Sequence, residues 1–269
     1  MKIFYILVLS IFCLAGAAND NIKVLTYNVL ADKNYRSLRI VELLKLISKE
    51  DADILAFQEA TSWFIEDLKT FGLLKKYHAC EIKNKVQATG GLLILSKNKI
   101  SNLIIKHLYS RQSRMLLVAE TKIKGVTFKI ATCHLESPLD SGGLRAIQLA
   151  QFFKELKDKP NCIFMGDFNF GDKETPESKA LDKNYKDIWL ALHKDQKGFT
   201  WNIEESPMAK AGSFPNEKSR RLDRILFKSE ILKPVSCKII GNKPVKLSKE
   251  IFPSDHFGLV AEFKIIAKK

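Results

Sequence analysis

The pattern of apolar and polar positions predicts several strands that each end on a polar side chain. The clearest example is residues 162–169, with the sequence CIFMGDFN, where an apolar run typical of a buried strand leads directly into Asp167 and Asn169. Side chains alternate across a strand, so these two are expected to face one side while Phe168 turns back toward the core. Open α/β sheets bind ligands at such a strand edge.

Three other strands predicted from apolar runs also end on polar groups. They span residues 22–28, 53–59 and 126–134 and end on Asn28, Glu59 and His134, respectively. If these strand ends meet at one edge of the fold, the sequence predicts a cluster of amide, carboxylate and imidazole groups there.

Helices and a meander complete the predicted architecture. Helical spacing of apolar residues predicts amphipathic helices over 40–47 and 144–156, and an apolar helix over 188–192. Strand-like segments with short polar connections follow one another between residues 77 and 134, which indicates a meander rather than strict β-α-β alternation. The segment 204–220, which contains prolines and a glycine, predicts a long mobile loop.

Residues 1–18 are predicted to be an export signal and residues 19–269 a single domain. Lys2 precedes an apolar run, and the small residues 15–18 resemble a cleavage site. The apolar run is too short to span a membrane, so we expect a secreted or periplasmic monomer, with an uncleaved anchor as the alternative. No internal repeat, low-complexity tract or linker divides the remaining chain.

The formal net charge of +14 favours a polyanionic partner. Charge alone does not separate nucleic acid from an anionic membrane, and a lysine-rich surface can simply keep a protein soluble. Four cysteines lie after the predicted signal, at Cys80, Cys133, Cys162 and Cys237, and their spacing leaves any pairing open. No C-x-x-C or H-E-x-x-H spacing occurs, which disfavours a zinc site.

The polar strand ends contain the residue types that phosphodiester hydrolysis needs. Carboxylate oxygens, supplemented by water and phosphate, suit Mg²⁺, and hydrolysis also requires a group that orients water and donors for the developing charge. Each residue alone has a structural interpretation. A histidine at a strand end is more often structural, Trp201 can be core, and Glu136 and Ser137 can cap the next helix. His78, His107 and His193 keep the structural interpretation.

Six ordered motifs resemble the endonuclease/exonuclease/phosphatase superfamily. They are Tyr27-Asn28, Gln58-Glu59, residues 132–137 (TCHLES), residues 166–169 (GDFN), residues 221–224 (RLDR) and residues 254–256 (SDH). The resemblance covers residues 19–269 and implies a DNase I-like, four-layer α/β sandwich of two packed β-sheets flanked by helices. The HLES, RLDR and FPSDHFG runs are most similar to the branch of 5′-tyrosyl-DNA phosphodiesterases, which implies nucleic acid, and a DNA 5′ end in particular, as the partner.

The resemblance implies a metal side and a water-activating group. Glu59 would bind Mg²⁺, or Mn²⁺ in its place, and Asp255 would support the metal. Asp167 would orient and activate the attacking water. Asn28 and Asn169 would position phosphate and nucleophile.

The remaining implied roles concern the transition state and the substrate. His134 and His256 would stabilise the transition state, with Asp223 orienting His256. Trp201 would form an apolar wall. Ser137 and Arg114 would touch the nucleic-acid strand.

One position departs from the close family pattern. An acidic residue is expected two places after Asn28, and Leu30 stands there. The stretch 27–32 instead resembles the deadenylase and phosphodiesterase branch, which loosens the substrate assignment but not the reaction class. Because one carboxylate is absent, weak metal affinity is predicted for the free enzyme.

Three alternatives to the tyrosyl-DNA hypothesis stay open. The chain can be an exported nuclease of broad specificity, or a sphingomyelinase or inositol-phosphate phosphatase with the same core site. No large apolar hairpin that would insert into a bilayer is evident. An inactive binding module is disfavoured because the full set of motif residues is present.

Overall fold

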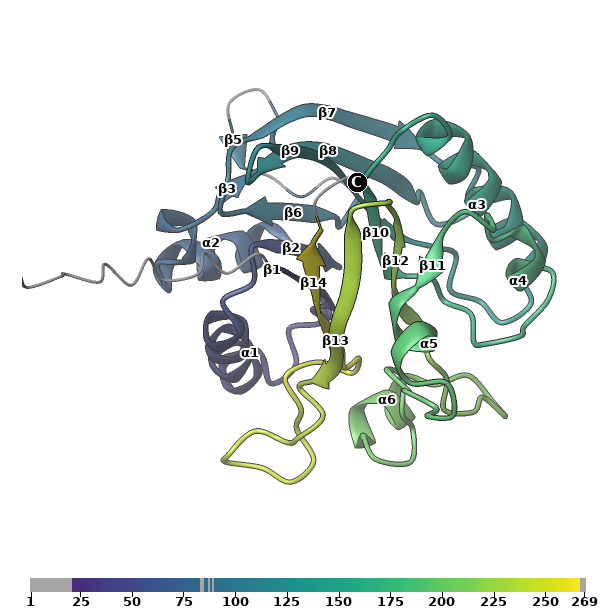
Figure 1. Cartoon of the computed structure of the whole chain (residues 1–269). Coiled ribbons are helices and arrows are strands. Elements are labelled where there is room, and N and C mark those ends of the chain that lie inside the picture. Colours follow the sequence, from purple (N-terminus) through teal and green to yellow (C-terminus); the bar gives the residue numbers. More distant parts are fainter. Residues whose placement is uncertain (1–20, 83–84, 87, 89, 267–269) are drawn as a thin grey trace, which may run out of the picture.

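The computed structural model describes residues 21–82, 85–86, 88 and 90–266, which form two six-stranded sheets packed face to face (Figure 1). The first sheet has the strand order β13 (Leu232–Ile240), β14 (Gly258–Ile265), β1 (Asn21–Asn28), β2 (Ile54–Gln58), β6 (Leu93–Ser96) and β3 (His78–Ala79). The second has the order β11 (Lys186–Asp187), β12 (Asp223–Lys228), β10 (Cys162–Asp167), β9 (Val126–His134), β8 (Met115–Ile123) and β7 (Ile100–His107). A separate hairpin joins β4 (Glu81–Ile82) to β5 (Lys85–Val86).

Helices cover the outer faces of the sheets, which confirms the predicted four-layer sandwich (Figure 1). The described helices are α1 (Arg36–Glu50), α2 (Ser62–Thr70), the 3₁₀ turn η1 (Leu73–Lys75), α3 (Gly142–Leu156), α4 (Glu177–Ala180), α5 (Ile188–Leu192) and α6 (Pro207–Gly212). Apolar residues of α1 and α2 pack on the first sheet, and those of α3 pack on the second. Leu43, Leu44 and Ile47 of α1 are buried, as their helical spacing predicts.

Strand alternation separates the core between the sheets from the cores under the helices. On β10, Ile163 and Met165 point into the space between the sheets, whereas Phe164 points outward against α3. The ring of Phe164 stacks on Phe152 with centroids 4.2 Å apart. Burial of one such side chain stabilises the fold by roughly 1.5–3 kcal/mol. The same alternation carries Asp167 to the inner side, at the end of the strand.

The differences from the sequence-based expectation include the predicted loop 204–220 and strand β13. The predicted loop 204–220 contains α6, whose first turn is capped by Ser206, because its hydroxyl accepts a hydrogen bond from the Ala209 N–H at 3.2 Å. Strand β13 was not predicted. It lies at a sheet edge, four of its nine residues are exposed, and its register shifts between Pro234 and Ser236, so it lacks a continuous apolar signal.

The predicted signal at residues 1–18 and the domain boundary after it lie outside the described residues. Among the residues that are described, no helix has both the length and the apolar character needed to cross a membrane. The four cysteines of the described chain are buried and carry free thiols.

Candidate active site

The topology brings the polar strand ends to one rim of the sandwich. Because β1 pairs with β2 and β9 pairs with β10 in parallel, their carboxyl ends meet in pairs at the same edge. His134 lies opposite Asp167 in the register of β9 and β10, and Asp223 lies opposite Asp167 where β12 begins. The segment 254–257 leads into β14 at this rim, and the Ser254 hydroxyl donates to the Asn28 carbonyl at 2.7 Å.

Side-chain parity explains why these residues face one another. Asn28, His134, Asp167 and Asp223 each continue the inward-facing series of their own strand, two residues beyond a side chain that lies between the sheets. Deep inside the sandwich this series is apolar, and toward the rim it becomes polar, beginning with Thr26 and Thr132. The predicted cluster of polar strand ends is therefore present.

Gly166 permits the close approach of β10 and β9 directly before Asp167. Its φ is 152°, and a Cβ atom there would lie 2.3 Å from the backbone oxygen of Cys133. Any larger residue would push the two strands apart and move Asp167 relative to His134.

Glu59 enters the site through an unusual backbone conformation. It follows β2 with φ 56°, in the left-handed region that non-glycine residues seldom adopt. Its Oε2 accepts a hydrogen bond from the Ala31 N–H at 2.8 Å, and its Oε1 accepts one from the Asn28 Nδ2 at 3.1 Å. Leu30, at φ 59°, has the same left-handed conformation, and its N–H donates to the Asn28 Oδ1 at 3.1 Å. At the position where the family pattern expects a carboxylate, the Leu30 backbone thus orients Asn28, whose amide in turn contacts Glu59.

Asn28 links Glu59 to Asp167, because its amide also donates to the Asp167 Oδ2 at 3.1 Å. The Asp167 Oδ1 accepts from the Asn169 N–H at 2.9 Å, and the Asn169 amide donates to the Leu135 carbonyl at 3.0 Å. Burial acts to raise the pKa of Asp167, but the neighbouring imidazoles and these hydrogen bonds outweigh it and hold the pKa below its ordinary value. Asp167 is therefore an ionised carboxylate at neutral pH.

His256 is held by Asp223 in a buried imidazole–carboxylate pair, with Nδ1 and Oδ2 2.9 Å apart. Thr200 orients the carboxylate's strand by accepting from the Asp223 N–H at 2.9 Å. Burial favours the neutral imidazole, but Asp223 and Asp167 outweigh it and keep the pKa of His256 well above its ordinary value. The other ring nitrogen, Nε2, lies 3.7 Å from the Asp167 Oδ2. His256 thus presents a positive charge to the site.

His134 differs from His256 in its charge. Its Nε2 lies 3.3 Å from the Asp167 Oδ2. Burial lowers the pKa of His134 to about 4, and the Arg114 guanidinium acts in the same direction against the favourable charge of Asp167. At neutral pH the site therefore combines one neutral and one cationic imidazole.

Glu59 and Asp255 fit a hard divalent cation. Both line the same cavity, and burial together with the charge of Glu59 raises the pKa of Asp255 to about 6. A cation bound between two carboxylates reduces the electrostatic repulsion between them, and carboxylate oxygens are the ligands that Mg²⁺ prefers. Asp167, Asp223 and His256 also have possible ligand atoms within 4.8 Å of one another, but the Nδ1 of His256 is already engaged by Asp223.

The cavity at the rim has a volume of about 170 Å³ and collects most of the predicted residues. Those that line it are Glu59, Arg114, His134, Ser137, Asp167, Asn169, Trp201, Asp255 and His256. Asn28 and Asp223 lie behind it and hold these side chains through hydrogen bonds. Phe214, Glu217, Arg220 and Leu222 also line it but were not predicted. Leu222 stands inside the RLDR motif, and the other three lie in the predicted loop 204–220.

Arg114 reaches the cavity from a loop that Glu136 fastens. The buried Glu136 carboxylate accepts hydrogen bonds from the Ser110 hydroxyl at 2.8 Å and the Arg111 N–H at 3.0 Å. The Arg114 N–H in turn donates to the Ser110 hydroxyl at 2.9 Å, and the Arg114 Nη2 lies 3.4 Å from the Ser137 Oγ. Glu136 thus anchors this loop, and the N-terminus of α3 has no side-chain cap.

Trp201 is both a core residue and a wall of the cavity, which are the two interpretations that the sequence left open. It packs with Ala209 and Leu222 in a small apolar cluster, and it also lines the cavity with its ring 4.9 Å from that of His256. The other three histidines stay outside the cavity. His78 and His107 are exposed on strands, and the His193 Nε2 contacts the Cys237 carbonyl at 2.8 Å.

Comparison with known proteins finds relatives named tyrosyl-DNA phosphodiesterase 2. The Xenopus tropicalis protein is 33% identical over 186 residues, which cover 65% of this chain and 48% of the relative. The Xenopus laevis protein is 30% identical over 223 residues, which cover 80% of this chain and 58% of the relative. The chain thus spans about half the length of these curated relatives.

The fold is also found among solved structures. The crystal structure of D. rerio TDP2 complexed with single strand DNA product superposes with a TM-score of 0.78 at 23% identity, over 90% of this chain and 98% of that one. At this identity the likeness supports the two-sheet fold.

The prediction that the protein is exported is wrong in the light of these relatives. Their name refers to DNA as the substrate, and DNA is held inside cells, which opposes a secreted or periplasmic location. The exported location was inferred from the composition of residues 1–18 alone, and such local composition does not report where the relatives of a chain act.

A protein-family model also matches this chain, over most of its length. The model described as Endonuclease/Exonuclease/phosphatase family matches residues 25–256, a range that contains every residue of the candidate site. The same range covers the whole second sheet and the first sheet except the start of β1 and strand β14. This chain therefore belongs to the endonuclease/exonuclease/phosphatase family.

Proposed function

We propose that the chain is a metal-dependent phosphodiesterase that releases an aromatic or other bulky group from the 5′ phosphate of a DNA strand. The observation that carries this proposal is the convergence of Asp167, His134, His256 and Glu59 on one small cavity. Phosphodiester hydrolysis requires a carboxylate that orients water, hydrogen-bond donors for the phosphoryl oxygens and a carboxylate that binds the metal.

Asp167 orients the attacking water in this proposal. Its depressed pKa keeps it ionised, so it accepts a hydrogen bond from water and directs the lone pair toward phosphorus. A depressed pKa also makes it a weak base, so orientation is its main contribution. The Asn169 side chain also lines this cavity, where its amide can help to position the phosphate of the substrate.

The two histidines stabilise charge on the phosphoryl oxygens. Protonated His256 offers a charge-assisted hydrogen bond from Nε2, because Asp223 occupies Nδ1. Neutral His134 contributes an N–H without adding a second positive charge beside Arg114. Glu59, supported by Asp255, would hold Mg²⁺, which supplies Lewis-acid polarisation of a phosphoryl oxygen when bound.

The substrate class rests on the leaving group and on the relatives. A phenol has a pKa near 10, far below that of an alcohol, so a phenolate leaves without a second metal or a strong general acid. The relatives carry tyrosyl-DNA in their names, and one structural neighbour holds a single-strand DNA product. Trp201 and Phe214 provide an apolar wall of the cavity for an aromatic group or a terminal base.

A substrate panel tests this function. The purified chain is assayed in Mg²⁺ with a 5′-tyrosyl oligonucleotide, unmodified single- and double-stranded DNA, sphingomyelin and inositol phosphates. We expect the tyrosyl oligonucleotide to be cleaved fastest and EDTA to abolish turnover. Faster cleavage of sphingomyelin or of internal DNA linkages would transfer the chain to another branch of the family, and full activity in EDTA would exclude the metal.

A further inference from the structure

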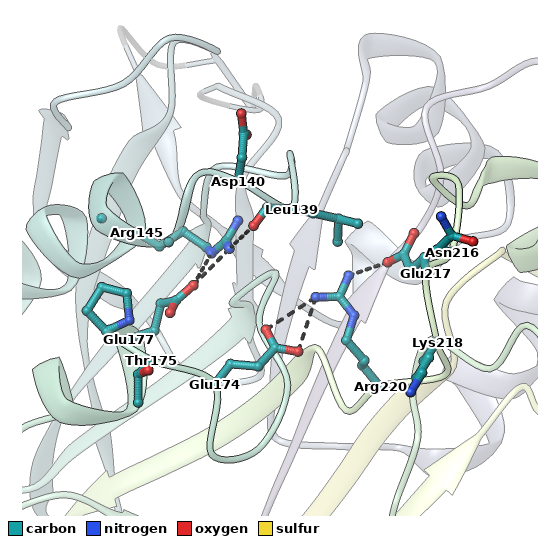
Figure 2. A pocket seen from close by; sticks show the side chains of 13 residues that line it. Leu139, Asp140, Arg145, Glu174, Thr175, Glu177, Asn216, Glu217, Lys218 and Arg220 are labelled. Carbon is teal, nitrogen blue, oxygen red and sulfur yellow. Dashed lines mark hydrogen bonds and ion pairs between the residues drawn. The ribbon is translucent and has the colours of Figure 1, made fainter.

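A second cavity, of about 510 Å³, adjoins the catalytic one (Figure 2). It lies between the start of α3, the segment 174–177 that leads into α4, and the segment 216–220 before β12. Glu217 and Arg220 line both cavities and therefore form their common boundary. A ligand that extends from the catalytic cavity into the second cavity would therefore pass beside these two side chains.

Arg220 is fixed at this boundary by its backbone and by two carboxylates. Its N–H donates to the Trp201 carbonyl at 2.8 Å, and its carbonyl accepts from the Trp201 N–H at 3.0 Å. Its Nη1 lies 3.4 Å from the Glu174 Oε2, and its Nη2 forms an ion pair with Glu217. Figure 2 shows the guanidinium between the two carboxylates.

Arg220 is shared between two carboxylates. The nearby Arg145 is already paired with Glu177 inside the protein, with both side chains 2% exposed. The Glu217 side chain is only 3% exposed, whereas that of Glu174 is 37% exposed. Because one guanidinium faces two carboxylates, an entering anion can replace one of them and still leave the cation fully compensated.

We propose that Arg220 binds a phosphodiester group of the substrate strand at the passage into the second cavity, and that Glu174 and Glu217 act as a carboxylate latch that weakens this binding. The inference rests on the proposed function. If the 5′ phosphate of a DNA strand lies in the catalytic cavity, the next phosphate of that strand lies outside this cavity and needs a binding group of its own. Arg is suited to this contact because its planar fork binds phosphate and carboxylate with the same geometry.

The latch predicts opposite effects for the two partners of one ion pair. Arg220→Gln should raise KM for a 5′-tyrosyl hexanucleotide by about five- to tenfold and reduce the slope of log KM against log salt by about one. Glu217→Gln should lower KM for the same substrate by about threefold or more, because it releases Arg220 while it retains an amide oxygen for the Phe214 N–H. A merely structural ion pair would move KM in the same direction in both variants.

The assay includes a matched control and a double variant. Lys210→Gln removes an exposed charge of α6 that lines neither cavity, so it should leave KM unchanged. In the Arg220→Gln background, Glu217→Gln should no longer lower KM. Thermal unfolding of each variant identifies any loss of fold, and Arg220→Lys provides a second variant that should retain part of the phosphate binding.

A 5′-aryl phosphodiester of a single nucleoside separates this inference from the proposed function. Both variants should affect the hexanucleotide more than the single nucleoside, which has no second phosphate. Equal changes on the two substrates, or a KM that rises in Glu217→Gln, would overturn the latch even if both substrates are cleaved. Failure of the wild-type chain to cleave either substrate would refute the proposed function itself.

Discussion

At the scale of single residues, the site owes its chemistry to different environments around similar side chains. Glu59, Asp167 and Asp255 are all carboxylic acids, but their pKa values shift in opposite directions. Asp167 is beside two imidazoles and accepts hydrogen bonds, so it stays ionised, whereas burial and a neighbouring carboxylate raise the pKa of Asp255. His134 and His256 diverge in the same way, because Asp223 pairs with His256 alone.

Asp167→Asn should lower kcat on the order of 10²-fold, because the amide retains the size of the side chain but cannot orient water as a carboxylate does. The measurement is steady-state kinetics with the 5′-tyrosyl oligonucleotide, together with thermal unfolding. Asp195→Asn, which removes an exposed carboxylate away from the cavity, is the control and should match the wild type. Retention of near wild-type kcat in Asp167→Asn would remove the water-orienting role.

At the scale of elements, a cluster of charges fastens the strand that carries Asp223. Arg221 and Arg224, on either side of it in the chain, are buried and pair with Asp172 and Asp187. Asp172 belongs to the loop after β10, and Asp187 caps α5, where its carboxylate accepts from the Trp189 N–H at 3.0 Å. The cluster therefore joins β12, α5 and the loop that follows Asn169.

Stability should depend on pH through Asp172. Burial acts to raise its pKa, but the hydrogen bonds and charges of Arg221 and Arg224 lower it below its ordinary value. A depressed folded-state pKa adds stability that is present above the unfolded value, near 3.9, and is lost as pH falls through the folded value. Asp172→Asn should therefore have a lower Tm than the wild type at pH 7.

The difference in Tm should narrow as pH falls below about 4, since the contribution of the Asp172 charge declines between the unfolded and the folded pKa. Thermal unfolding of both proteins between pH 3 and pH 8 measures it, and Asp195→Asn again serves as the control for a removed carboxylate. A difference that stayed constant across this range would show that the carboxylate charge of Asp172 is not what stabilises the cluster.

At the scale of the whole molecule, the excess of basic residues acts on any nucleic-acid partner at a distance. The formal net charge is +14, although the catalytic cavity itself collects several carboxylates. The net positive charge of the protein attracts a polyanionic strand. The carboxylates of the cavity would bind a cation, which the scissile phosphate of that strand would contact.

Salt should therefore weaken strand binding selectively. KM for a 5′-tyrosyl oligonucleotide should rise with a steep slope of log KM against log salt, whereas KM for a small aryl phosphodiester should change little. Kinetics at several salt concentrations measure both slopes. Parallel slopes would indicate that the strand makes no phosphate contacts beyond the reacting centre.

The sequence determined by itself those features that depend on local periodicity. Alternation along β10 placed Asp167 and Phe168 on opposite faces, and helical spacing located α1 and α3, because these patterns act between residues a few positions apart. The predicted site residues came from the resemblance of the ordered motifs to the family, and nine of them line the cavity.

Only the tertiary structure decided how these segments meet. The Asn28 amide reaches Asp167 across 139 positions of the chain, and the left-handed backbone at Glu59 depends on contacts that no local pattern encodes. The edge strand β13 and the cavity wall formed by Glu217 and Arg220 were missed for the same reason. Their side chains are polar or half exposed, so their positions depend on pairing with distant strands and carboxylates. Hydrophobic periodicity does not predict such pairing.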